Sequence, residues 1–112
     1  MGKTYLKQFK RFRQHLDFVK NIFVSQEPGC AVDHEIQMSL AHDKNMVLRK
    51  GGDVTDPYIL FALEAWDVGG VNALKNWILG GMQVTDEDMI KRYRLIIPDI
   101  LTPYFKEADS SQ

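Results

Sequence analysis

Three Gly-Gly pairs divide the middle of this chain into short segments, and they restrict its fold more than any other feature. The pairs are Gly51-Gly52, Gly69-Gly70 and Gly80-Gly81. Glycine has a low helix propensity and readily adopts the left-handed dihedrals that end helices. We therefore predict that each pair ends a helix. None of the pairs has the strand-to-helix context of a phosphate-binding loop.

The segments on either side of the second pair carry helix signals. Thr55 or Asp56 suits the N-cap of a helix, and Pro57 suits its first turn, where the missing N–H would be unpaired anyway. This predicts a helix over residues 56–66 that is apolar on nearly every side and therefore central. A shorter amphipathic helix is predicted over residues 71–79, followed by another that begins at the N-cap Thr85.

The N-terminal region predicts one long helix. Apolar residues recur there at spacings of four and three, which places them on a single helical stripe. Phe18 and Ile22 fall on the opposite side, so we expect the second half of this helix to be buried on two faces. Pro28-Gly29 ends it. The stripe consists of Tyr5, Phe9, Phe12, Leu16, Val19 and Phe23.

The stretch from 35 to 49 is ambiguous. Ile36, Met38 and Leu40 alternate with polar residues, which is typical of a strand, and a turn-forming segment follows. These patterns favour a short β-hairpin over residues 35–49. The alternative is a helix capped by Asp33, because most residues here are good helix formers.

These segments predict a mainly α fold, a compact single-domain bundle of four or five helices, or an α+β fold if the hairpin forms. A length of 112 residues is close to the commonest domain size, so residues 1–112 are expected to form one domain. The polar tail, about residues 109–112, is expected to be flexible.

Composition excludes several classes. A net charge of −1 gives no general attraction to nucleic acid or anionic membranes. The chain has no apolar run long enough to span a bilayer, so no membrane association is expected. Cys30 is the only cysteine, which favours a reducing, cytoplasmic location. No cofactor-binding motif is recognisable, and no cofactor is expected.

The N-terminal helix is a candidate nucleic-acid interface. Residues 1–24 carry six basic side chains and one acidic one, and Lys7, Arg11, Arg13 and Lys20 could contact phosphates. The charge is spread around the helix, so a solvated exterior is the favoured interpretation. A helix-turn-helix formed by residues 56–66 and 71–79 is weaker still, because its second helix has one positive charge and no arginine.

A metal-dependent hydrolase is another candidate. The pair His42-Asp43 resembles the His-Asp pair of the HD-type metal phosphohydrolases, and His15 and Asp67 stand in the matching order as candidate catalytic residues. His34 is a further candidate metal ligand, with His42 and Asp43. Nothing else matches this family, so we favour solvated surface or turn positions for these side chains.

The favoured function is a small protein-binding or regulatory module without enzymatic activity. Trp66 and Trp77 are candidate binding residues, because tryptophan carries much of the energy of protein interfaces. Both also fit the apolar faces of their helices, so a core position is the main alternative. The partner would be another protein or a second copy of the chain.

Overall fold

A computed structural model describes residues 2–105, with side chains from Tyr5 onward, and these residues form helices and no strand. The predicted mainly α, single-domain fold is confirmed. The predicted flexible tail at 109–112 lies outside the described residues. The elements are α1 (Gly2–Gln14), α2 (Leu16–Phe23), α3 (Ala31–Arg49), α4 (Pro57–Leu79), α5 (Asp86–Leu95), the 3₁₀ helix η1 (Asp99–Leu101) and α6 (Thr102–Phe105).

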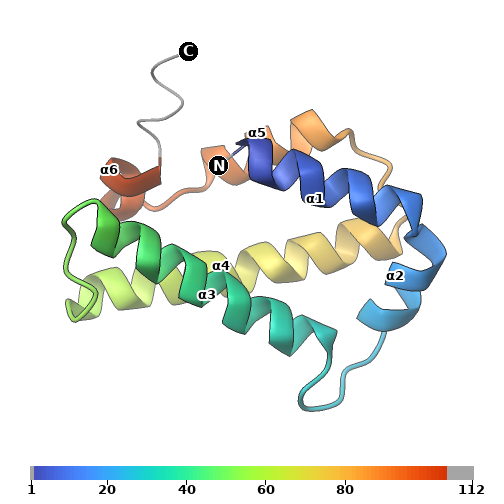
Figure 1. Ribbon diagram of the computed structural model, residues 1–112, viewed down its shortest axis with the longest axis horizontal. Helices are drawn as coiled ribbons and strands as arrows, with labels where there is room; N and C mark the ends of the chain where they lie inside the picture. The colour runs from blue at the N-terminus through green and yellow to red at the C-terminus, as the bar shows by residue number, and fades with distance from the viewer. Residues whose placement is uncertain (1, 106–112) are drawn as a thin grey trace.

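The two longest helices, α3 and α4, run antiparallel across the molecule (Figure 1). Helices α1 and α5 pack against each other along one edge of this pair. The short α2 closes one end against α3 and α4, and η1 and α6 close the other end. Side chains from four separate segments of the chain therefore meet around the middle of α3 and α4.

Two predicted helix starts are confirmed. The Asp56 carboxylate accepts a 2.8 Å hydrogen bond from the Tyr58 amide, with Pro57 in the first turn. The Thr85 hydroxyl accepts a 3.1 Å hydrogen bond from the Asp88 amide and caps α5. Each cap satisfies a backbone N–H that has no partner inside its helix, which is why local sequence identifies these positions.

The prediction that every Gly-Gly pair ends a helix is right for the first and last pairs and wrong for the middle pair, Gly69-Gly70. Gly51 and Gly81 have φ values of +84° and +90° at the ends of α3 and α4. Helix α4 instead continues through Gly69-Gly70 as one element of 23 residues. The predicted turn, and with it the helix-turn-helix, is absent. Burial on both sides of the pair offsets the low propensity of glycine, about 1 kcal/mol per residue.

The predicted hairpin at 35–49 is also wrong, because residues 31–49 form one 19-residue helix. Its inward face carries Val32, Ile36, Leu40, Asp43 and Val47, at helical spacings of four and three. The acidic residue in this stripe obscures the helical period in the sequence. Met38, which completes the strand-like alternation, is 57% exposed.

The single N-terminal helix predicted from the apolar stripe is two helices, α1 and α2, separated at His15. The stripe itself faces the core as expected, with Phe9 and Phe23 fully buried. The expected burial of the opposite face is wrong, since Phe18 is 67% and Ile22 38% exposed. Helix α2 closes the end of the molecule, and no described element covers its outer side.

The core consists of two clusters, and Asp67 lies on α4 where one gives way to the other. The first joins α1, α2 and α5 to the second half of α4, and the second joins α3, η1 and α6 to the first half. The first includes Phe9, Phe23, Val71, Leu74, Trp77, Ile78 and Ile90; the second includes Val47, Ile59, Leu63, Trp66, Ile97, Leu101 and Phe105.

Candidate functional site

A buried pair of carboxyl groups lies between the two long helices. Asp43 of α3 is 3% exposed and Asp67 of α4 is 6% exposed, and the two side chains lie close enough for Asp43 to change the pKa of Asp67. Burial, followed by the hydrogen bond and negative charge of Asp43, raises the pKa of Asp67 to about 9. Asp67 therefore keeps its proton at neutral pH, as a buried carboxyl beside a second carboxyl does.

Two tyrosines flank this pair from α1 and α5. Burial, together with the nearby negative charge of Asp43 and Asp67, raises the pKa of Tyr5. Burial raises the pKa of Tyr93, whose hydroxyl donates a 2.7 Å hydrogen bond to the Gly70 carbonyl oxygen. The Tyr5 and Tyr93 rings stack with their centroids 6.1 Å apart. Both hydroxyls therefore stay neutral over the physiological pH range.

A small cavity of about 50 Å³ adjoins the carboxyl pair, and we refer to it as the acidic cavity. A wider groove of about 420 Å³, between α1 and α3, leads to its outer side and is lined by Asp43 and His42. Tyr5, Gln8, Glu35 and Ser39 line both spaces, so the groove and the cavity adjoin. The acidic cavity is also lined by Phe9, Trp66, Asp67, Gly70, Val71, Leu74 and Tyr93.

The candidate hydrolase residues are only partly brought together. Asp43 and Asp67 meet, and His42 Nδ1 lies 3.1 Å from Asp43 Oδ1 on an exposed side chain. His15 lies elsewhere, at the break between α1 and α2, and lines a different groove with His34. Among the described residues, no group of three or more His, Cys, Asp or Glu side chains is arranged to hold a metal ion.

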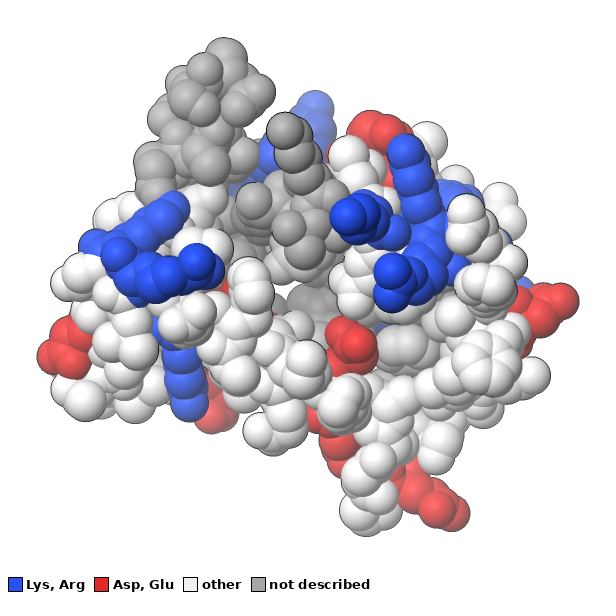
Figure 2. All heavy atoms as spheres, in the orientation of Figure 1, with Lys and Arg blue, Asp and Glu red and all other residues white. Residues whose placement is uncertain are grey.

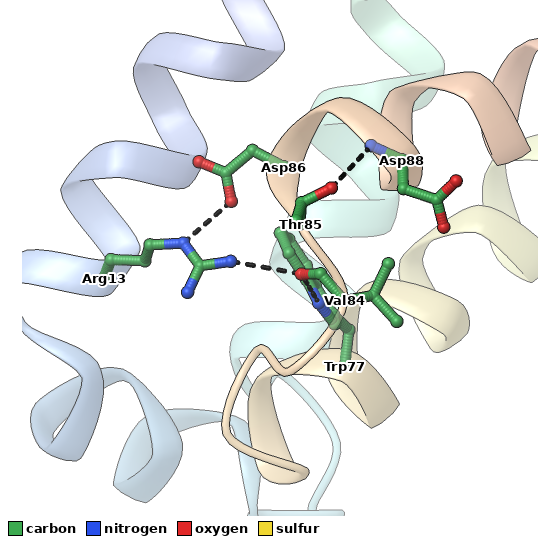
Figure 3. Close-up of polar contacts among 6 residues, drawn as sticks. All are labelled: Arg13, Trp77, Val84, Thr85, Asp86 and Asp88. Atoms are coloured by element: carbon green, nitrogen blue, oxygen red, sulfur yellow. Dashed lines mark hydrogen bonds and ion pairs between the residues drawn. The ribbon is translucent and has the colours of Figure 1, made fainter.

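Arg13, predicted as a binding residue, is engaged within the fold (Figure 3). Its Nε donates to Asp86 Oδ1 at 2.8 Å and its Nη2 to the Val84 carbonyl oxygen at 3.1 Å. The guanidinium also lies 5.6 Å from the centre of the Trp77 ring, whose Nε1 donates to the same carbonyl at 2.9 Å. Arg13 thus ties α1 to the segment that leads into α5.

The other predicted basic residues lie toward solvent. Lys7 and Arg11 are exposed on α1, and Lys20 is half-buried on α2. Figure 2 shows Lys and Arg side chains gathered over α1, whereas the surface over α2 is largely uncharged. The basic character of the N-terminal region is therefore concentrated beside an uncharged face.

The uncharged face contains an apolar groove of about 510 Å³ between α2 and the start of α3, here called the α2–α3 groove. Phe18 and Ile22 form its exposed wall, and Arg11, His15 and His34 lie along its rim. The predicted binding residues Trp66 and Trp77, in contrast, are each 7% exposed and belong to the core. The remaining lining is Phe12, Val19, Phe23, Ala31 and Glu35.

Comparison with known proteins gave no relative: no protein-family model, no curated protein and no solved structure matches this chain. Within residues 2–105, no helix combines the length and apolar character needed to cross a lipid bilayer.

Sequence reasoning missed the side chains that complete both sites. Tyr5 and Tyr93 are separated by most of the chain, and only the packing of α1 against α5 brings them together. The sequence predicts a buried Phe18 from its apolar character and its place opposite the stripe, whereas the structure leaves it 67% exposed. A useful signal does exist for the carboxyl pair, because Asp43 and Asp67 each occupy a position in an otherwise apolar helical stripe.

Proposed function

We propose that this protein is a small, non-enzymatic binding module that docks a segment of another protein in the α2–α3 groove. The observation that carries the proposal is the exposure of Phe18, 67%, on the wall of an apolar groove. Exposed apolar surface with a polar rim is characteristic of protein interaction sites. The single thiol, Cys30, supports a cytoplasmic setting as part of the same proposal.

The charges around the groove specify the partner. Arg11, His15 and His34 lie on its rim, Lys7 is exposed nearby on α1, and Glu35 is the one acid in the lining described. A docking segment with large apolar residues flanked by Asp or Glu complements this surface. A second copy of the chain is a less complementary occupant, because it presents the same basic rim.

Selection from a random phage-displayed peptide library tests this proposal directly. We expect enriched peptides to combine apolar anchors at helical spacing with acidic residues. Phe18→Ser should weaken their binding about tenfold, because a central aromatic anchor contributes at least 1.4 kcal/mol. Phe61→Ser is the matched control, since Phe61 is also largely exposed, at 75%, but lies on α4 outside the groove.

Three outcomes would overturn the proposal. One is the absence of enriched peptides, and another is equal binding to wild type and Phe18→Ser. The third is a dimer in sedimentation analysis that dissociates in Phe18→Ser, which would assign the groove to a second copy. Circular dichroism of both variants verifies that they are folded.

The two other candidate functions have less support. A hydrolase of the HD type lacks a ligand cluster in the described residues. For a nucleic-acid-binding helix, Arg13 is paired with Asp86 and only part of the predicted basic set remains accessible. Neither is favoured by a specific observation.

A further inference from the structure

The outward face of α4 carries two large aromatic side chains that are mostly exposed. Tyr58 is 76% and Phe61 is 75% exposed, more than any other large apolar side chain of the described chain. No residue of α4 lines the α2–α3 groove, so this face is a second surface, distinct from that groove. Exposed aromatic residues that lie together on one helix are typical of interaction surfaces.

The two aromatic residues begin a row that runs along the whole of α4 at alternating spacings of three and four. A row with this spacing is the heptad seam through which two helices pair side by side. None of its members is buried, and Lys75 is the only charged one. We call this row the α4 seam; it consists of Tyr58, Phe61, Ala65, Val68, Asn72, Lys75 and Leu79.

The core of the domain uses the other side of α4. Leu63, Val71 and Leu74 are buried there, and α4 packs through this side on α2, α3 and η1. Helix α4 is therefore largely apolar on two sides, one of which has no cover among the described elements. A surface helix of a globular domain normally has one apolar face, so the second face indicates a second helix-packing partner.

The length and symmetry of the seam suit a second copy of α4. The helix has 23 residues and is about 34 Å long, close to the 40 Å longest dimension of the described molecule (Figure 1). Phe61 and Leu79 lie nine residues before and nine after Gly70, and Val68 and Asn72 lie two before and two after it. An antiparallel copy with its two-fold axis at the level of Gly70 therefore places Phe61 of each copy against Leu79 of the other.

The same register brings opposite charges together. Lys75 and Ala65 lie five residues on either side of Gly70, so Lys75 of one copy lies opposite the small Ala65 of the other. Its ammonium group is then beside the adjacent Glu64, and the two-fold axis repeats this ion pair. Neither Glu64 nor Lys75 has an ion pair within the described chain. The surface is thus complementary in charge to its own antiparallel copy.

We propose that the α4 seam is a dimerisation surface, which pairs antiparallel with the α4 seam of a second copy of this chain. Phe61 is the apolar anchor of the interface. The two ion pairs between Lys75 and Glu64 fix the direction and the register of the helices. The dimer uses none of the residues that line the α2–α3 groove.

Sedimentation equilibrium over a range of protein concentrations tests the proposal. Wild type should show a reversible monomer–dimer equilibrium. Phe61→Ser should raise the dissociation constant about tenfold or more, because a symmetric interface loses this anchor twice. Phe18→Ser is the matched control, since Phe18 is also an exposed aromatic residue but lies in the α2–α3 groove, and it should leave the constant unchanged. Circular dichroism verifies that both variants are folded.

Charge reversal tests the antiparallel register. Glu64→Lys or Lys75→Glu alone should weaken self-association about threefold or more, because each substitution turns both ion pairs into repulsions. A mixture of these two single variants should restore the affinity, since both charge pairs become attractive between unlike copies.

Four results would overturn the proposal. They are a wild type that stays monomeric up to millimolar concentration, an unchanged dissociation constant in Phe61→Ser, loss of the dimer in Phe18→Ser, and a mixture of Glu64→Lys with Lys75→Glu that associates no more tightly than either variant alone.

Discussion

The Tyr93 hydroxyl donates a 2.7 Å hydrogen bond to the Gly70 carbonyl oxygen, which joins α5 to the middle of α4. A Cβ atom at Gly70 would lie 3.3 Å from Tyr93 Cε1, closer than ordinary van der Waals contact. A Cβ at Gly69 would meet no atom within 4 Å. The two glycines of this pair therefore differ: only Gly70 allows the close approach of a neighbouring helix.

Alanine at each of these positions should separate helix propensity from packing. Gly69→Ala is expected to raise the free energy of unfolding by about 1 kcal/mol, because Gly69 is in a helix interior with open space around it. Gly70→Ala is expected to be about 1 kcal/mol less stable than Gly69→Ala, since Tyr93 must move. Urea denaturation followed by circular dichroism measures both. Equal stabilisation by the two substitutions would contradict this account.

Arg13 should matter more to stability than a typical surface arginine. Arg13→Ala is expected to cost about 1–2 kcal/mol, since it removes the contacts to Asp86, Val84 and Trp77 together. Arg13→Lys should restore only part of the lost stability, because an ammonium group cannot donate to Asp86 and Val84 with the fixed planar geometry of a guanidinium.

The control for Arg13 is Arg92→Ala. Arg92 pairs with Asp88 one turn away on α5, at 3.0 Å, and both side chains are largely exposed. Its loss should cost less than about 0.5 kcal/mol. Thermal unfolding of the three variants gives the ranking, and a cost for Arg92→Ala equal to that for Arg13→Ala would contradict the prediction.

The buried carboxyl pair should make stability fall as pH rises. The pKa of Asp67 is about 9 in the folded protein and 3.8 in an unperturbed carboxyl. Asp67 therefore contributes its full effect on the free energy of unfolding below about pH 4, and this contribution is lost as pH rises toward about 9. The reason is that the carboxyl ionises at a lower pH in the unfolded chain than in the folded protein. Asp67→Asn, which cannot ionise, should lack this dependence.

The measurement is the difference in free energy of unfolding between Asp67→Asn and wild type, obtained from urea curves across this pH range. The difference should increase in favour of Asp67→Asn as pH rises. Glu64→Gln, at an exposed position on the same helix, should show no such trend. A wild type that gains stability relative to Asp67→Asn with rising pH would reverse the sign and refute the assignment.

Features of the sequence that act within one or two turns predicted local structure correctly. Asp56 and Thr85 cap helices because their side chains reach an amide two or three residues away. Gly51 and Gly81 end helices because their own backbones adopt positive φ. The apolar stripe beginning at Tyr5 faces the core because its spacing alone places it on one side of a helix.

The candidate site was only partly predictable. The sequence predicts Asp43 and Asp67 as candidate catalytic residues, and the structure brings these two together. The other two candidates, His15 and His42, do not complete a metal-ligand cluster among the described residues. Tyr93 carries no local signal for its role. Its contact with Tyr5 depends on the packing of α5 against α1.

The sequence by itself determined where the capped helices begin and which face of the N-terminal region is turned to the core. It also determined that the chain forms one mainly α domain. Only the tertiary structure decided that α4 continues through Gly69-Gly70 and that residues 35–49 are helical. In both helices one face is buried against neighbouring helices, and in α4 this burial has a cost to overcome. In α4, burial against neighbouring helices outweighs a local cost of about 1 kcal/mol per glycine. The same packing buries Asp43 and Asp67, which interrupt the apolar stripes of α3 and α4.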